Sequence, residues 1–209
     1  TQQLAEILQY NVLGAQVAST DLSEEQEPES LTGERVFVTV DNGNISVNGA
    51  ASVDTDRADI TASNGIVHTI DQVILPDAYG TIVDAAAKRY FLSTLVSAVL
   101  DAQLDDDLSA AGPFTVFAPT NAAFDALPAI PTGQDLIDVL TYHVIPSQVL
   151  SGDLQPSQTV TTLNGATVEI TVSGDTVTIN GSVEVNRADL ETNNGVIHVI
   201  DGVLLPPAN

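Results

Sequence analysis

The sequence predicts an α+β fold that occurs as two tandem copies, and three observations support this prediction. Residues 64–76 recur as residues 194–206, with Asn, Gly, His, Ile, Asp, Val, Leu and Pro in identical places. A short stretch with apolar residues at helical spacing lies upstream of each copy. The residues in between alternate apolar and polar side chains and are interrupted by Asn-Gly pairs, the pattern of β-hairpins. A repeat of this length indicates a duplicated structural unit.

The first element of each copy is a short amphipathic helix followed by a helix-breaking residue. Residues 4–10 show the helical pattern and precede Gly14, and residues 136–142 repeat the pattern before Pro146. Residues 21–30, which come next in the first copy, contain four glutamates. This stretch is predicted to be a polar loop and is the best candidate for disorder.

Antiparallel β meanders are predicted over residues 34–75 and 159–205, because short alternating runs are separated by Asn-Gly or Gly-Asp pairs. The Asn-Gly pairs that open the two recurring segments are expected to supply the positive φ of a tight turn. The β-branched run after each pair is expected to be a strand with both faces covered, ended by the proline.

The segment between the two copies occurs once. Apolar residues at helical spacing over 81–104 predict a helix with one break, and residues 114–119 predict a short apolar strand ended by proline. Thr120 is expected to cap a further helical turn. The second copy is therefore preceded by helices and a strand that the first copy lacks.

Composition excludes several classes of partner. The chain of 209 residues is 44% hydrophobic, so it can bury a core, but it has 28 acidic against 5 basic residues and a net charge of −23. Nothing could neutralise the phosphates of a nucleic acid, and an anionic membrane surface is disfavoured for the same reason. The absence of cysteine excludes disulfides and thiolate metal sites. No apolar run is long enough to cross a membrane, and the first residues do not form a signal peptide.

Three motifs resemble signatures of the fasciclin domain. Residues 115–124 resemble its first signature, Tyr142-His143-Val144 its central Tyr-His motif, and residues 195–206 its closing signature. This resemblance covers residues 79–207, whereas residues 4–76 resemble only the second half of such a domain. The predicted domains are therefore a C-terminal half at 1–78 and a complete fasciclin-like domain at 79–209, each a β-wedge or sandwich with packed helices.

The Tyr-His motif is the candidate binding site. The resemblance implies that Tyr142 and His143 belong to a surface recognised by adhesion receptors. The residues alone favour a structural role, with the tyrosine packed in the core and the histidine near a helix C-terminus, where a cation is favoured. The first copy has Tyr10-Asn11 at this position, so a function of the histidine is expected only in the second copy.

The other two histidines are expected to be structural. His68 and His198 have apolar neighbours on both strand faces, which favours a core histidine bonded to a backbone group over a catalytic or metal-binding one. No metal site and no cofactor are predicted, since Asp54–Asp56 and Asp105–Asp107 lack the pattern of a calcium loop. The residues assigned structural roles in the two recurring segments are Asn64, Gly65, His68, Asn194, Gly195 and His198.

An Arg-Ala-Asp tripeptide precedes each recurring segment, at residues 57–59 and 187–189. It differs by one methyl group from the Arg-Gly-Asp adhesion tripeptide, but alanine resists the tight exposed loop that glycine permits. The Arg and Asp of each copy are expected to lie on one strand face as a surface ion pair.

The function implied by the resemblance is a non-catalytic, extracellular cell-adhesion or matrix module that contacts proteins or surface glycans. Partners would be other proteins, cell-surface components or further fasciclin-like domains of the same or a neighbouring chain. The sequence has no Gly-x-Ser-x-Gly, His-Glu-x-x-His or phosphate-binding glycine loop, so no enzymatic activity is predicted. Two alternatives stay open: binding of a small apolar ligand such as a carotenoid or lipid, and a structural protomer of a surface fibre or array.

The missing first half of the first copy has a structural consequence. Its meander would expose an apolar face that includes Val36, Val38 and Val67, because nothing like residues 81–124 precedes it. We expect that the natural polypeptide extends N-terminally with such a segment, which the intact mass of the native protein would reveal.

Salt is expected to stabilise the protein. With a net charge of −23 and one lysine, repulsion among surface carboxylates opposes folding, and screening weakens that repulsion. The melting temperature should therefore be higher in molar NaCl than in low-salt buffer. An unchanged or lower value in NaCl would contradict this prediction. Sulfate is unsuitable for the comparison because it strengthens hydrophobic burial whatever the charge.

Overall fold

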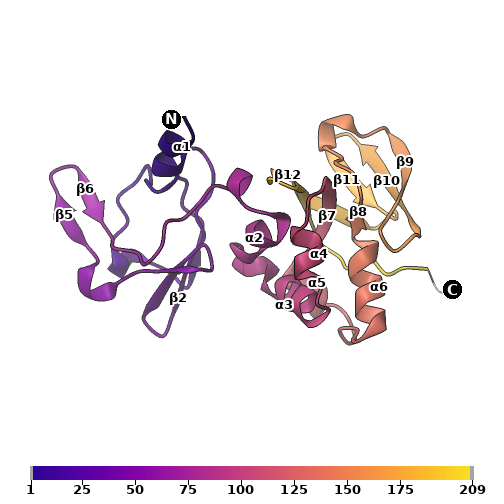
Figure 1. Ribbon diagram of the computed structural model, residues 1–209, viewed down its shortest axis with the longest axis horizontal. Helices are drawn as coiled ribbons and strands as arrows, with labels where there is room; N and C mark the ends of the chain where they lie inside the picture. Colours follow the sequence, from indigo (N-terminus) through magenta and orange to yellow (C-terminus); the bar gives the residue numbers. More distant parts are fainter. Residues whose placement is uncertain (1, 208–209) are drawn as a thin grey trace. The chain divides into compact units, whose positions relative to one another are not determined.

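The computed structural model describes residues 2–207, and the chain in it forms two compact units. The first unit comprises the residues up to Pro76 together with Ala87–Tyr90, and the second comprises Asp77–Ala86 and the residues from Phe91 onward (Figure 1). Both contain helices and sheets, in agreement with the predicted α+β class. In the described residues, no helix has the length and apolar character needed to cross a membrane.

A seven-stranded sheet organises the second unit, in the order β8-β7-β13-β12-β11-β10-β9. β13 lies between β12, which is antiparallel to it, and β7, which is parallel to it. All six residues of β13 are buried, as expected for a strand with covered faces. The strands are β7 (Phe114–Pro119), β8 (Val144–Ile145), β9 (Ser157–Thr161), β10 (Thr167–Ser173), β11 (Thr176–Ile179), β12 (Val183–Glu191) and β13 (Gly195–Ile200).

The helices of the second unit follow the sequence-based expectation except for α4, which begins at Asp105, where the helical pattern was expected to end. The predicted break falls between α2 and α3, and the hydroxyl of Thr120 accepts a hydrogen bond from the Ala123 N–H at the start of α5, as a cap should. The helices are α2 (Ile82–Ala87), α3 (Ser93–Asp101), α4 (Asp105–Ser109), α5 (Asn121–Asp125) and α6 (Gln134–Tyr142).

The second unit has two hydrophobic cores. The helix-side core joins residues of 82–124 to residues of the second half of the domain, and the sheet core is built almost entirely from the second half. The helix-side core contains Ile82, Leu92, Leu95, Val99, Leu108, Val116, Phe124, Leu136, Leu140, Val144, Ile197 and Val199, among others. The sheet core contains Phe117, Tyr142, Ile145, Val168, Ile170, Ile179, Ile200 and Leu204.

The first unit has the second half of this architecture. A four-stranded sheet, β1-β2-β3-β4, and a separate two-stranded sheet, β5-β6, follow α1. Residues 21–30, expected to be a polar loop and the best candidate for disorder, contain the two-residue strand β1, which pairs with β2, so the loop expectation was wrong for Glu25 and Gln26. The elements are α1 (Gln2–Tyr10), β1 (Glu25–Gln26), β2 (Val38–Asp41), β3 (Asn44–Val47), β4 (Ala51–Ser52), β5 (Ile60–Ala62) and β6 (Gly65–Val67).

The core of the first unit corresponds to the sheet core of the second. It contains Tyr10, Val36, Val38, Ile45, Val47, Ala51 and Ile74. The expectation that Val36 and Val38 are exposed was wrong, because α1 and the meander cover them without a first half. Val67 is exposed, as expected.

The Asn-Gly pairs fall into two groups. Asn42-Gly43, Asn48-Gly49 and Asn180-Gly181 have positive φ at both residues and form the expected turns. The pairs at 64–65 and 194–195 do not adopt positive φ, and their glycines are the first residues of β6 and β13. β6, expected to be buried, is partly exposed, and β13 ends at Ile200 rather than at the proline.

Candidate functional site

Tyr142 joins the end of α6 to the sheet of the second unit. Its side chain is buried, its hydroxyl donates to the Thr167 carbonyl (2.9 Å), and it accepts from Nδ2 of Asn180 (3.1 Å). Tyr10 does the same in the first unit, where it donates to the Arg35 carbonyl (3.2 Å) and accepts from Nδ2 of Asn48 (2.9 Å). A buried tyrosine with a fully bonded hydroxyl is therefore a repeated part of the fold.

His143 is buried beside Tyr142, and both of its ring nitrogens are bonded. Nδ1 donates to the Val139 carbonyl (2.7 Å), which leaves Nε2 to accept from the Leu204 N–H (2.9 Å). Burial lowers the pKa of His143 to about 4, so the ring is neutral at pH 7. The expectation of a cation at this helix end was wrong, because the desolvation of a buried charge outweighs the attraction of the helix dipole.

Asn11 takes the place of this histidine in the first unit. Its Nδ2 donates to the carbonyls of Ile7 and Ile74, both at 2.8 Å. Ile7 and Ile74 are the counterparts of Val139 and Leu204. Asn11 and His143 therefore connect equivalent helices, α1 and α6, to equivalent C-terminal segments, but they do so with different side-chain atoms.

The burial of Tyr142 and His143 bears on their candidate role in binding. Each side chain is 2% exposed, so neither presents its polar atoms to a partner in this conformation. A role in recognition stays a prediction, and it would act through the backbone and the surface residues that these two side chains position.

His198 lies in a three-residue cluster with Asp189 and Ser151. Its Nε2 donates to the Val149 carbonyl (2.8 Å) and its Nδ1 accepts from the Asp189 N–H (3.2 Å), while burial lowers its pKa. The Asp189 carboxylate accepts from the backbone N–H (2.8 Å) and the hydroxyl of Ser151. The expected role, a core histidine bonded to backbone groups, matches this geometry.

The first unit repeats the cluster with His68, Asp59 and Ser19. Nε2 of His68 lies 2.8 Å from the Val17 carbonyl, and Nδ1 accepts from the Asp59 N–H (3.4 Å). Hydrogen bonds from the hydroxyl and N–H of Ser19 lower the pKa of the Asp59 carboxyl. Here the histidine is only half-buried.

These Ser, His and Asp side chains are not arranged for nucleophilic catalysis. In a catalytic triad the serine hydroxyl bonds the imidazole, whereas Ser151 bonds Asp189 and the imidazole of His198 is occupied by two backbone groups. The cluster instead holds the loop at Val149 and Ser151 against β12 and β13.

The expected ion pair within each Arg-Ala-Asp tripeptide was wrong. Asp59 and Asp189 adopt positive φ, which breaks the strand geometry that would place Arg and Asp on one face. Arg57 pairs instead with Asp54 (3.7 Å), and the Arg187 guanidinium lies 4.8 Å from the centre of the Phe91 ring.

Asn194 is the polar residue whose role sequence reasoning missed. Its Oδ1 accepts from the Ile82 N–H (2.8 Å), and its Nδ2 donates to the carbonyls of Leu108 (2.8 Å) and Ala110 (2.9 Å). It thereby connects the start of β13 to α2 and α4. A buried asparagine can satisfy three backbone groups at once, which hydrophobic periodicity does not reveal.

Gly195 lets β7 approach β13. A Cβ atom at this position would lie 2.3 Å from the Phe114 carbonyl oxygen. The glycine is needed for this close approach of two backbones and not for a turn.

Comparison with known proteins agrees with this architecture. The family model of the fasciclin domain matches residues 1–76 and 91–206. The chain belongs to the fasciclin domain family. A solved FAS1 domain pair from the insect cell adhesion molecule Fasciclin I has the same fold, with a TM-score of 0.62 and 19% identity over 98% of this chain and 80% of that one.

Three relatives show how much of the chain has similar sequences in other proteins. Protein sll1483 of Synechocystis is 45% identical over 63% of this chain and 76% of its own length. Human periostin is 36% identical over 79% of this chain, and rabbit transforming growth factor-beta-induced protein ig-h3 is 30% identical over 97% of it. The matched regions make up 20% and 30% of these two proteins.

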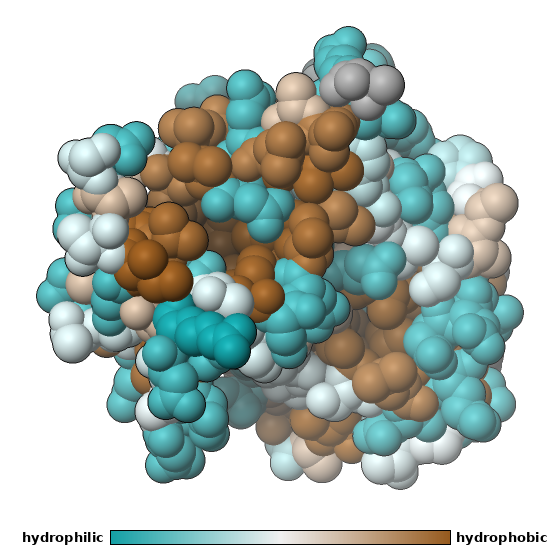
Figure 2. Space-filling model, turned by 60° about the vertical axis from the view of Figure 1, so that its left-hand side comes forward, coloured by the Kyte–Doolittle hydropathy of each residue, from teal (hydrophilic) through white to brown (hydrophobic). Residues whose placement is uncertain are grey.

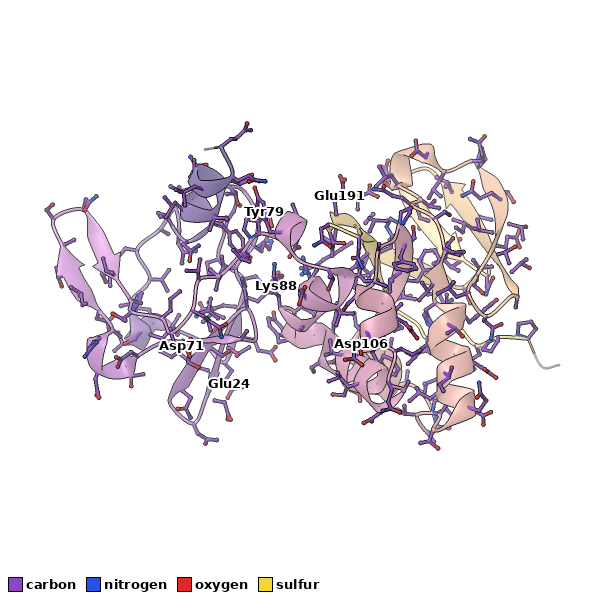
Figure 3. The ribbon with its side chains drawn as sticks, viewed as in Figure 1. Glu24, Asp71, Tyr79, Lys88, Asp106 and Glu191 are labelled. Carbon is purple, nitrogen blue, oxygen red and sulfur yellow. The ribbon has the colours of Figure 1, made fainter. Side chains whose placement is uncertain are left out.

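The acidic clusters of this fasciclin protein do not form a metal centre in the described residues. In residues 2–207, no group of three or more His, Asp or Glu side chains is placed to hold a metal ion. Asp105–Asp107 form the first turn of α4, where negative charge is favoured by the helix dipole; Asp106 is labelled in Figure 3.

One small pocket bears on the alternative of a small apolar ligand. It lies in the helix-side core, is lined by residues such as Val83, Val99 and Leu140, and has a volume of about 30 Å³. Pockets for small molecules are typically roughly 300–1,000 Å³. This cavity is therefore too small for a carotenoid or lipid.

Replacing His198 should cost more stability than replacing His68. H198A removes a buried ring, the donor to the Val149 carbonyl and the acceptor for the Asp189 N–H, at a cost of about 1–3 kcal/mol. H68A removes the same bonds from a half-buried site, where water can replace them. Calorimetric melting of the two variants checks the order, and equal losses would contradict it.

His143 should make stability depend on pH. The folded pKa of about 4 lies below the ordinary 6.5, so between these values the unfolded chain binds a proton that the folded chain does not. The stabilising contribution is complete above pH 6.5 and is lost as pH falls toward 4, by up to about 3 kcal/mol. H143N, which introduces the side chain that Asn11 provides in the first unit, should lack this dependence.

Denaturant unfolding of the natural chain and H143N from pH 7.5 to 4.5 measures this contribution. The natural chain should lose stability relative to the variant as pH falls, and the remaining titrating groups cancel in the difference. A difference that stays constant over this range would show that His143 is not the group responsible.

Proposed function

We propose that this protein is a non-catalytic extracellular module that acts by adhesion, through contact with other proteins or with surface glycans. Its membership of the fasciclin family supports the proposal, since the solved relative of the same fold is a cell adhesion molecule. The matched relatives periostin and ig-h3 are much longer than this chain, so the activities of those whole proteins are not carried over.

The observation that supports the non-catalytic part of the proposal is that the three histidine rings are hydrogen-bonded to backbone groups. Both ring nitrogens of His68, His143 and His198 lie within hydrogen-bond distance of backbone groups. General acid–base chemistry needs a side chain that can exchange a proton with a substrate. These three rings serve instead to hold loops and helix ends in place.

The charge of the protein indicates the chemistry of its partner. Two of the five basic residues, Lys88 and Arg89, are buried, so the exposed surface is even more acidic than the composition suggests. Lys88, labelled in Figure 3, donates to the Leu75 carbonyl (2.7 Å). A partner that presents basic groups would be attracted to this surface, and salt would weaken that attraction.

The structure bears differently on the two alternative functions, binding of a small apolar ligand and a role as protomer of a surface fibre or array. The cavity of about 30 Å³ in the helix-side core gives no support to a carotenoid or lipid ligand. A role as protomer of a surface fibre or array stays a prediction, for which extensive contacts between identical chains would be required.

Cell adhesion is the direct test of the proposed function. Cells of the producing organism should attach to a surface coated with the folded protein in greater number than to an albumin-coated surface, and less in high salt. Cell fractionation should place the native protein at the surface or in the medium. Attachment no greater than to albumin, together with a cytoplasmic location, would refute the proposal.

A further inference from the structure

β9 is the last strand at one end of the seven-stranded sheet, and in the described residues only β10 pairs with it (Figure 1). Thr162 donates to the Ala166 carbonyl (2.9 Å) and Val172 donates to the Pro156 carbonyl (3.0 Å) at the two ends of this pairing. Bonded residues alternate in an antiparallel pair, so the even-numbered residues of β9 bond to β10. The odd-numbered residues point their N–H and C=O groups toward the open edge. These exposed residues are Ser157, Thr159 and Thr161.

The equivalent edge of the first unit carries a charge at each of these positions. Glu25 of β1 lies opposite Thr39 in β2, and its counterpart Ser157 has the same position against β10. A row of like charges along an edge strand prevents a second edge from pairing with it. The three outward positions of the first edge are Glu25, Glu27 and Glu29.

Proline and glycine also differ between the two edges. Pro28 interrupts the first edge because it cannot donate to the ladder, and β1 is two residues long whereas β9 has five. The Gly14 N–H donates to the Glu29 carbonyl (3.4 Å) and so covers the end of that edge. The counterpart of Gly14 is Pro146, which has no N–H, so the Thr161 carbonyl receives no such bond. The second edge is therefore the more open of the two.

The β9 edge is uncharged in a strongly acidic protein. The chain has 28 acidic residues against 5 basic ones, and hydrophilic side chains, in teal, occur across the face drawn in Figure 2. Two copies of such a chain repel one another, so they can meet only where the contact itself carries no charge and salt screens the rest. The sequence of β9, Ser-Gln-Thr-Val-Thr, meets this condition, and its β-branched residues favour a strand.

The edge is also complementary to itself. When two β9 strands meet in antiparallel fashion about a two-fold axis at Thr159, that residue lies opposite its own copy and Ser157 lies opposite Thr161. Outward-facing residues then lie opposite outward-facing residues, and each such pair exchanges two hydrogen bonds, which gives about six in total. The hydroxyl groups of serine and threonine add side-chain hydrogen bonds across such pairs.

Glu169 is the acidic residue beside the centre of this contact. It lies opposite Thr159 in β10, so its side chain is on the same face of the sheet. In the two-fold pair the two copies of Glu169 are three strand spacings apart, which is about 14 Å. The Debye length is about 8 Å at physiological ionic strength and about 3 Å in molar salt, so the repulsion between these carboxylates is largely screened.

We propose that the open edge of β9 is a self-association site, at which two copies of the chain pair their β9 strands in antiparallel fashion about Thr159. The pairing joins the two seven-stranded sheets into one continuous sheet. It is a weak contact, because one pair of short strands buries less than the roughly 1,600 Å² of a standard interface. The site does not depend on the proposed adhesive function: attraction to a basic partner weakens in salt, whereas the pairing of two acidic copies strengthens.

Sedimentation equilibrium of the folded chain measures this pairing. The dimer fraction should rise with protein concentration, and the association constant should increase at least about tenfold between about 0.1 M and 1 M NaCl, because screening removes the repulsion between copies. A chain that stays monomeric at about 1 mM in molar NaCl would overturn the proposal.

A charge swap at Thr159 tests the two-fold geometry. T159E and T159K each place like charges opposite one another, at a Cα distance of about 5.5 Å, so each variant alone should dimerise about threefold or more weakly than the natural chain. An equimolar mixture of the two should recover the pairing, since glutamate then lies opposite lysine. The matched controls are T176E and T176K, which change an exposed threonine of β11 and should dimerise like the natural chain.

Amide exchange identifies the strand that pairs. In the dimer the N–H groups of Ser157, Thr159 and Thr161 should exchange at least about tenfold more slowly than in the monomer. Those of Gln158 and Val160, which face β10, should not change. Equal melting temperatures of T159E and T176E at a concentration where both are monomeric show that the fold is intact.

Two other outcomes would also overturn the proposal. A dimer that T159E leaves intact, or in which the Thr159 amide exchanges as in the monomer, uses another surface. If a synthetic peptide of alternating lysine and valine slows the same amides while the chain alone stays monomeric in molar NaCl, the edge binds a basic partner strand instead of a second copy.

Discussion

The parallel pairing of β7 with β13 is the contact on which the second unit depends. It joins two segments that are distant in sequence, and the helices on either side of β7 then close over the paired strands to form the helix-side core. Gly195 permits the approach and Asn194 fixes the helices to the strand that follows it. Without a strand in the place of β7, the corresponding part of the first unit is a two-stranded hairpin, β5-β6, that is separate from its main sheet.

The buried tyrosines, His143 and Asn11 show a second constraint, which is that their polar atoms need hydrogen-bond partners inside the fold. His143 and Asn11 each make two hydrogen bonds to backbone groups at the end of a helix, but with different side-chain atoms. The hydroxyls of Tyr142 and Tyr10 each bond a backbone carbonyl and an asparagine side chain. An unbonded polar group in a core destabilises the fold. A substitution at one of these positions is therefore tolerated only if the new side chain can still form hydrogen bonds with nearby groups. The exchange of His for Asn meets that requirement.

Much of the fold was predictable because it follows from local patterns. The bounds of β7, the break after α2, the helix ending in Tyr142 and the turn at Asn42-Gly43 all follow from periodicity, capping and positive φ. The roles of Asn194 and Gly195 could not be predicted from local patterns, because they depend on residues about 80 positions or more away in the sequence. Their contacts with Phe114, Leu108 and Ile82 show this.

The sequence-based predictions for residues 21–30 and for the Arg-Ala-Asp tripeptides were wrong for similar reasons. β1 is a strand only because β2 pairs with it, which composition does not show. Asp59 and Asp189 adopt positive φ, and their carboxylates bond serine groups that lie about 40 residues away in the sequence, which the tripeptide alone does not reveal. At the candidate site, the identity of Tyr142 and His143 was visible in the sequence, whereas their burial was a property of the packed unit.

The burial of Lys88 and Arg89 has a consequence for how readily proteases can cleave the folded chain. Trypsin-like proteases cut after lysine or arginine, and they need the target in an accessible, locally flexible stretch. Of the five basic residues in the sequence, only Arg35, Arg57 and Arg187 are exposed in the described structure. The folded chain therefore offers at most three sites to this class of enzyme, and the scarcity of accessible Lys and Arg residues limits their cleavage of it.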